Sequence, residues 1–174
     1  MKIYALVALS ALLLAPPSLL AADFGLKGVE ISAGIAAPQD FDTGYALGVD
    51  LDLGDITHSL TLVASAEYWK ASGRDFGVDL DADNLSAGVD VRYYVFEPRR
   101  GLYVGGGGRV NHLSSEAAVP LGGFGTLVVK TTDNKVSPEG VLGWSGGRFY
   151  MEGRYNAIDG LNTVSVVVGV RFGK

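Results

Sequence analysis

The chain has 174 residues and a net charge of −5, so nucleic acid is not an expected partner. It contains no cysteine, which excludes disulfides and thiolate metal sites. Glycine is abundant, with 25 residues, yet 48 % of the chain is hydrophobic. Because the apolar residues are rich in valine, tyrosine and phenylalanine, this composition favours packed strands over disorder.

The first 22 residues are typical of a secretory signal peptide. A lysine precedes an apolar stretch over about residues 3–15, and two alanines stand before the first acidic residue. Pro16 and Pro17 interrupt the apolar run well short of the roughly 20 residues that a membrane-spanning helix needs. We therefore expect export, cleavage after Ala22, and one mature domain over residues 23–174.

Eight segments of the mature chain alternate between apolar residues and polar or small ones, which is the period of a β-strand. In chain order they cover about residues 26–36, 44–53, 58–70, 85–96, 101–113, 135–145, 148–157 and 162–173. No helical period of comparable length occurs after the signal peptide. The pattern predicts an all-β fold, an eight-stranded antiparallel up-and-down β-barrel.

The connectors between these segments alternate in length. GDIT, EPRRG and SGG are short, whereas APQDFDT, ASGRDFGVDLDADN and the segment 114–134 are long, and AIDGL joins the last two strands. An even strand number, with short turns at one end and longer loops at the other, is typical of transmembrane β-barrels, whose short turns face the periplasm.

The fourth segment, LSAGVDVRYYVF, has one apolar face and one polar face, and the barrel could turn either of them toward water. A soluble barrel of the lipocalin kind would turn Asp90 and Arg92 outward and cover its surface with lysine and glutamate. The polar face here carries mostly glycine, serine, aspartate and arginine, which suit the narrow interior of an eight-stranded barrel. We therefore expect the apolar face to meet lipid.

The apolar face also places aromatic residues near the strand ends, where membrane barrels carry interfacial belts. The expected interface aromatics are Tyr45, Tyr68, Tyr93, Trp144, Phe149, Tyr155 and Phe172.

The signal peptide, the eight alternating strands and the last strand TVSVVVGVRFGK resemble the small outer-membrane β-barrel superfamily of OmpA- and OmpX-like proteins. The resemblance implies a transmembrane barrel in the cell outer membrane, without a cofactor. It implies outer-membrane lipid, lipopolysaccharide and the outer-membrane assembly machinery as partners, and we expect a monomer. Members of the superfamily include structural anchors, adhesins and lipid-modifying enzymes, so the fold leaves function open. We expect a non-enzymatic structural or surface-interaction module.

Charged residues on the inner face form the first candidate site. A salt-bridged lumen is expected, because a buried charge without a partner costs several kcal/mol. The alternative is a narrow, cation-preferring pore lined by the excess of carboxylates. The set comprises Glu30, Asp50, Asp52, Glu67, Asp90, Arg92, Arg109, Glu139, Glu152, Arg154 and Arg171.

Two further motifs suggest chemistry. His112, Ser114 and Glu116 contain the elements of nucleophilic acyl transfer and resemble the His-x-Ser of lipid A deacylases, which keeps a lipid A-modifying hydrolase as an alternative. Asp79, Asp81 and Asp83 alternate as in the first half of a calcium loop, although position six is asparagine rather than glycine. For these aspartates we expect a solvated acidic loop and no metal.

Overall fold

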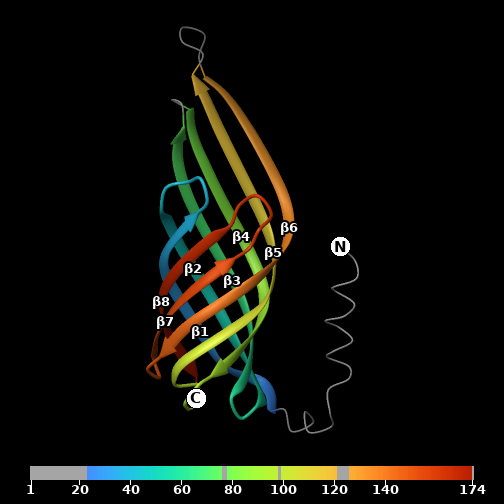
Figure 1. Cartoon of the computed structure of the whole chain (residues 1–174), viewed down its shortest axis with the longest axis vertical. Coiled ribbons are helices and arrows are strands. Elements are labelled where there is room, and N and C mark those ends of the chain that lie inside the picture. Colours follow the sequence, from blue (N-terminus) through green and yellow to red (C-terminus); the bar gives the residue numbers. More distant parts are fainter. Residues whose placement is uncertain (1–22, 76–77, 98, 121–125, 174) are drawn as a thin grey trace.

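The computed structural model describes residues 23–75, 78–97, 99–120 and 126–173, and it forms a closed antiparallel β-barrel (Figure 1). Each strand pairs with its neighbours in the chain, and β1 pairs with β8 to close the ring. This confirms the predicted eight-stranded barrel. The strands are β1 (Asp23–Pro38), β2 (Gly44–Thr57), β3 (Leu60–Asp75), β4 (Val78–Tyr94), β5 (Gly101–Pro120), β6 (Thr126–Ser145), β7 (Phe149–Asn156) and β8 (Thr163–Gly173).

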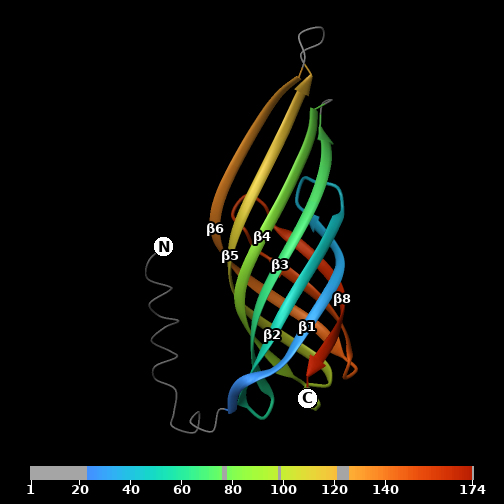
Figure 2. The same cartoon turned by 180° about the vertical axis from the view of Figure 1, so that it is seen from behind.

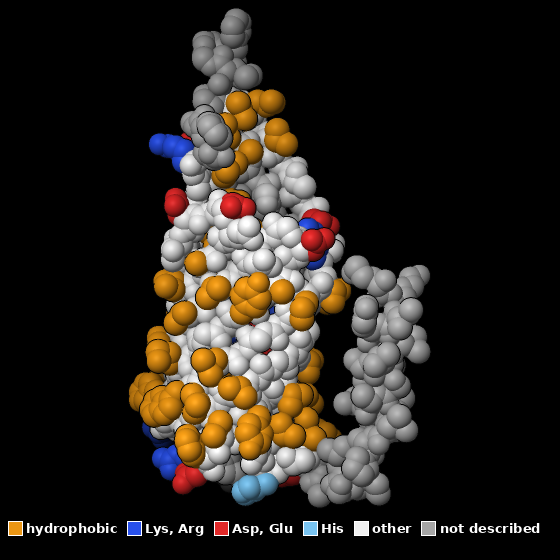
Figure 3. Space-filling model, in the orientation of Figure 1, with side chains coloured by type: hydrophobic (Ala, Val, Ile, Leu, Met, Phe, Trp, Pro, Cys, Tyr) orange, Lys and Arg blue, Asp and Glu red, His pale blue; other side chains and the backbone are white. Residues whose placement is uncertain are grey.

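The two faces of each strand differ as the alternation predicts. On β1, Glu30 and Ser32 are buried inside the barrel, whereas Ile31 and Ile35 are 53 % and 55 % exposed on the outside. The same alternation continues around the ring, so large apolar side chains cover the outer surface (Figure 3). The barrel therefore buries its charged side chains and exposes its apolar ones.

Four strands continue beyond the barrel at the loop end, and we name this part the extension. It consists of residues 71–75 of β3, 78–84 of β4, 111–120 of β5 and 126–138 of β6, and it rises well above the other strands (Figures 1 and 2). β6 pairs with β5 along its whole length but with β7 only over residues 139–145. Among the described residues, the edge of β6 over 126–138 therefore has no strand beside it.

Pro138 lies at the point where β6 leaves β7. Its carbonyl oxygen accepts a hydrogen bond from the Ala157 amide, so the backbone of this residue faces β7. Proline has no N–H, so Pro138 cannot donate a hydrogen bond back to β7. Such a residue suits the position where a strand edge becomes free.

The extension corrects the predicted strand bounds. Residues 71–84 and 114–134 were expected to be mostly loops, but residues 71–75 pair with 78–82, and residues 114–120 pair with 126–132, as long antiparallel strands. The period of two is lost over residues 114–120 and 126–134, where both faces of the extension can meet water and no single face needs to be apolar. It persists over residues 78–84, where Val78, Leu80 and Ala82 alternate with three aspartates, so this pattern could have extended the fourth predicted strand. Backbone pairing maintains these strands, together with side-chain contacts such as those of Ser72 with Asp81 and Arg74 with Asp79.

No helix among the described residues is long and apolar enough to cross a membrane. The predicted signal peptide, residues 1–22, lies outside the described residues.

Candidate functional site

The predicted inner-face charges all point into the barrel interior, which we call the lumen. Ten of them are no more than 6 % exposed, and Arg171 is partly buried near the turn end. Eight strands are just narrow enough for side chains to fill the interior, so these charges lie close to one another.

Arg92 of β4 lies at the centre of the lumen charges. Its Nη1 is 3.0 Å from Glu30 Oε2, and its Nη2 is 2.6 Å from Asp50 Oδ2 and 3.1 Å from Glu152 Oε2. The guanidinium also lies over the ring of Tyr103, at 5.4 Å from its centroid. Because its partners come from β1, β2 and β7, Arg92 crosslinks opposite walls of the barrel.

Arg154 and Arg171 extend this network around the ring. Arg154 Nη2 lies 2.6 Å from the same Asp50 oxygen, and Arg154 also pairs with Glu152. Arg171 Nε donates a hydrogen bond of 2.6 Å to Glu30, on the neighbouring strand. Each carboxylate is thus shared by two guanidinium groups, which offsets much of the cost of burying it.

A second group of charges lies nearer the loop end. Arg109 pairs with Glu139 and donates to the hydroxyl groups of Ser86 and Ser65, at 2.8 and 3.0 Å. Ser65 Oγ in turn donates to Asp90 Oδ2 at 3.0 Å. Asp90 is fully buried and forms no ion pair with any described residue, so its charge is compensated only through Ser65.

Arg99, in the turn between β4 and β5, joins the network from the turn end and was missed by the sequence analysis. Its Nε donates to Asp52 at 2.7 Å and its Nη1 to Asp55 at 2.9 Å. The hydrogen bond that Arg99 donates to Asp52 is the main reason why the pKa of its guanidinium is raised above its ordinary value. Nothing in the sequence singles out Arg99, because turn residues have no strand period.

Two uncharged layers fill the lumen toward the loops. Asn111 Oδ1 accepts hydrogen bonds from Asn84 and Asn156, at 3.1 and 2.9 Å. Above these amides lies an apolar cluster that includes Trp69 and Ile158, each 1 % exposed. Trp69 shares the inward parity of Glu67, so the period-two pattern could have located it.

The predicted interface aromatics all lie on the outer face. Six are between 47 % and 66 % exposed, and Tyr68 is half-buried against Tyr45, with ring centroids 6.1 Å apart. Phe24 and Phe96, which the sequence analysis did not include, add to the turn-end group at 61 % and 77 % exposure.

His112, Ser114 and Glu116 lie on β5 in the extension, where His112 and Glu116 are exposed but Ser114 is only 9 % exposed. His112 Nδ1 is hydrogen bonded to Asn134 Oδ1 at 2.8 Å. No hydrogen bond joins His112 to Ser114 among the described residues. Glu116 is in register with Lys130 on the neighbouring strand. The three residue types share a face, but no base contacts the candidate nucleophile.

Asp79, Asp81 and Asp83 lie on strand β4 rather than in the loop that the sequence analysis expected. Strand geometry separates alternate residues by about 6.6 Å, which is too far for the three carboxylates to enclose one ion. Arg74 is 2.6 Å from Asp79, and this hydrogen bond and charge raise the pKa of the guanidinium. Within the described residues, no group of three or more acidic, histidine or cysteine side chains could hold a metal.

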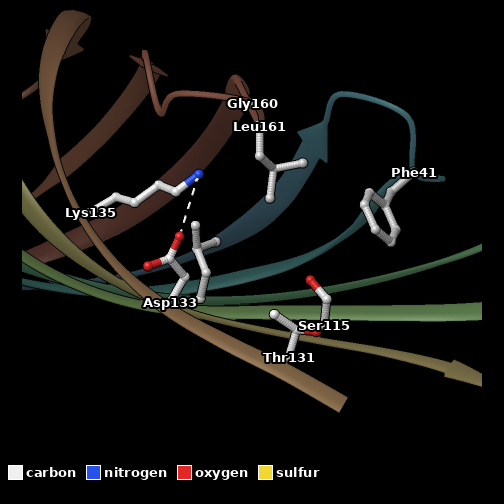
Figure 4. Close-up of a pocket in the computed structure, with 8 residues that line it drawn as sticks. Phe41, Ser115, Thr131, Asp133, Lys135, Gly160 and Leu161 are labelled. Carbon is white, nitrogen blue, oxygen red and sulfur yellow. Dashed lines mark ion pairs between the residues drawn. The ribbon is translucent and has the colours of Figure 1, made fainter. Parts of the chain in front are cut away.

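A cleft of about 240 Å³ lies where the extension meets the barrel mouth (Figure 4). Phe41 and Leu161, from two loops, face Thr131 and Lys135 on the inner side of the extension (Figure 4). Lys135 Nζ donates to the Asp159 carbonyl at 2.6 Å, which ties the extension to the β7–β8 loop.

Comparison with solved structures identifies the fold. Neither a family model nor a curated protein sequence matches the chain. Ail, the attachment invasion locus protein of Yersinia pestis, matches with a TM-score of 0.57 and 14 % identity, covering 84 % of this chain and 100 % of Ail; that structure contains the heparin analogue sucrose octasulfate.

Two further barrels match. Neisserial surface protein A has a TM-score of 0.52 and 14 % identity, covering 84 % of this chain and 96 % of that one. The N-terminal barrel of Pseudomonas aeruginosa OprF has a TM-score of 0.50 and 15 % identity, covering 85 % of this chain and 99 % of that one. The chain therefore has the fold of the small eight-stranded outer-membrane β-barrels.

Proposed function

We propose that this protein is a non-enzymatic, integral outer-membrane β-barrel that displays the extension as an interaction surface. The observation that carries the proposal is the inverted distribution of side chains. Buried ion pairs fill the interior, and apolar side chains such as Ile31, Leu142 and Phe149 are more than half exposed outside. Water would oppose so large an apolar surface, whereas lipid would solvate it.

The lumen acts as a structural plug in this proposal. Arg92, Arg154 and Asp50 meet at the barrel axis, and the apolar cluster around Trp69 lies above them. These side chains fill the lumen and hold one another through several ion pairs, so they leave little open space through which an ion could pass. This supports the plug over the cation-preferring pore.

The extension supplies the interaction surface. The edge of β6 over residues 126–138 presents backbone N–H and C=O groups to which a strand of another protein could add. Leu127, Val128 and Val129 are each at least 51 % exposed beside this edge. One protein of the same fold, Ail, carries attachment and invasion in its name, which fits a surface-exposed role.

The lipid A-modifying hydrolase receives less support. Among the described residues, no hydrogen bond joins either ring nitrogen of His112 to Ser114; the contact that the imidazole makes is from Nδ1 to Asn134. A hydrolase would need this histidine to take the serine proton. Loss of lipid A deacylation in a Ser114→Ala variant would establish the hydrolase and overturn the proposed role.

Cell fractionation combined with gel mobility tests the membrane assignment. We expect the expressed protein to sediment with outer membranes and to migrate faster unboiled than boiled, because a closed barrel leaves no sheet edge within the membrane for detergent to open. Recovery in the soluble periplasmic fraction, with the same mobility before and after boiling, would revive the lipocalin-like barrel.

A further inference from the structure

A basic cleft lies at the turn end of the barrel. It has a volume of about 620 Å³ and is bounded by the β4–β5 turn, the β6–β7 turn and the end of β8. Four arginines line it, together with Phe149. Arg99 and Arg171 already bind lumen carboxylates, but Arg100 and Arg148 are exposed. No described carboxylate forms an ion pair with either of these two, although Glu97 belongs to the same turn as Arg100.

The two exposed arginines come from neighbouring turns, Arg100 from the β4–β5 turn and Arg148 from the β6–β7 turn. Gly147, directly before Arg148, has a φ of +92°, and a Cβ built on it would lie 3.9 Å from both Nε and Nη2 of Arg100. The guanidinium of Arg100 therefore lies beside the backbone that presents Arg148. In an acidic chain, two such uncompensated cations define a local site for an anion.

An apolar groove of about 690 Å³ begins where the basic cleft ends. It runs over the outer face of β7, β8, β1 and β2, and Phe149 lines both the groove and the cleft. Trp144, Met151 and Val168 form part of its walls. The indole of Trp144 covers Gly146, where a Cβ would overlap the ring, so this tryptophan lies at the junction of groove and turn.

We propose that the cleft and groove together bind one anionic phospholipid of the leaflet at the turn end. The phosphate lies between Arg100 and Arg148, and an acyl chain lies in the groove beside Trp144. Guanidinium groups suit phosphate oxygens because they donate two parallel hydrogen bonds. Figure 3 shows Lys and Arg side chains, with acidic side chains beside them, just below the hydrophobic belt. In the proposed membrane location, lipid headgroups lie at this depth. The inference rests on the proposed membrane location.

Fluorescence quenching of Trp144 by brominated lipids tests the site. The chain has two tryptophans, and Trp69 is buried in the lumen, so the difference from a matched Trp144→Phe protein isolates the groove signal. Purified protein is reconstituted into vesicles of phosphatidylcholine and phosphatidylglycerol, with one lipid brominated at a time. One basic residue near a membrane surface contributes about 1 kcal/mol toward anionic lipid, which is about a fivefold preference.

We expect brominated phosphatidylglycerol to quench Trp144 with at least about a fivefold preference over brominated phosphatidylcholine, and salt to weaken that preference. Arg100→Gln and Arg148→Gln, separately and together, are expected to reduce it. Arg74→Gln, an exposed arginine of the extension, is the matched control and is expected to retain it.

Equal quenching by both lipids, or a preference that survives in the Arg100→Gln/Arg148→Gln double variant, would overturn the lipid site while leaving the membrane assignment intact. No quenching by either lipid would overturn the lipid-facing assignment and the site together. The wild-type comparison stands by itself if a variant fails to fold.

Discussion

Arg92 links the chemistry of single residues to the architecture of the barrel. Its three carboxylate partners come from three other strands, and it is fully buried. Glycines on β5 make room for it, because a Cβ at Gly105 would lie 3.3 Å from Arg92 Cγ. The glycine run at 105–108, which supplies no side chains of its own, thus lets the charges of β4 reach the barrel axis.

Substitution of Arg92 and of its neighbour tests which face is inside. Arg92→Ala leaves buried carboxylates without their shared cation, so we expect it to lower the free energy of unfolding by about 3–5 kcal/mol. Val91→Ala trims an outward side chain and should cost about 1 kcal/mol. Urea unfolding of both variants in lipid vesicles compares them, and a larger loss for Val91→Ala would mean that the barrel is inside out.

Two buried aspartates should respond differently to loss of charge. Asp50 bridges Arg92 and Arg154, so Asp50→Asn should lower the free energy of unfolding by about 3 kcal/mol. Asp90 has only Ser65 as a described partner, so Asp90→Asn should leave stability unchanged within about 0.5 kcal/mol or raise it. Urea titration measures the stability of both variants, and equal losses would show that Asp90 is paired with a cation as directly as Asp50 is.

At the scale of elements, β5 and β6 each belong to two parts of the molecule, the barrel and the extension. Their lower halves complete the barrel, and their upper halves form the extension with an open edge. The Pro138 carbonyl faces β7, and the backbone groups of alternate residues point to the same side of a strand. The even-numbered residues of β6 beyond Pro138 therefore direct their N–H and C=O groups to the free edge. The odd residues, such as Thr131 opposite Ser115, face β5.

A pair of proline substitutions separates the free edge from the paired edge. Thr131→Pro removes a donor in the β5–β6 ladder, so we expect amide hydrogen exchange around Ser115 to rise about tenfold or more. Thr132→Pro removes an N–H that faces solvent and should leave that exchange nearly unchanged. Amide exchange is measured by NMR in detergent micelles. A similar rise in the exchange rate around Ser115 in both variants would show that the β6 edge is covered.

At the scale of the whole molecule, the ring closes around a filled interior. Ion pairs occupy the middle, amides lie above them, Trp69 and its neighbours cap the loop end, and Arg99 spans the turn end. An ion crossing the lumen would have to break several of these contacts at once.

Conductance measurements test the filled lumen. We expect wild-type protein in planar bilayers to show no steady open channel, because the shared ion pairs of Arg92 and Arg154 block the axis. Removal of two of these cations, in an Arg92→Ala/Arg154→Ala variant that still migrates as a folded barrel, is expected to admit cations. A stable cation-selective conductance in wild-type protein would instead support the pore.

The sequence by itself determined the strand number, the closed antiparallel class and the inward direction of Asp90, Arg92 and the other lumen charges. It could do so because strand geometry sends alternate side chains to opposite faces, and the two faces of this barrel differ in chemistry. The outer aromatics, including Trp144 and Phe149, were predictable for the same reason.

Only the tertiary structure decided where strands end and which charges meet. Residues 114–120 and 126–134 mix polar and apolar side chains without a period of two, so no local pattern marks them as strands. Asp50 meets Arg154 across 104 positions of sequence, and Arg99 reaches Asp52 from a turn, because curvature and register bring these residues together. Pairings of this kind depend on closure of the ring, which no local pattern encodes.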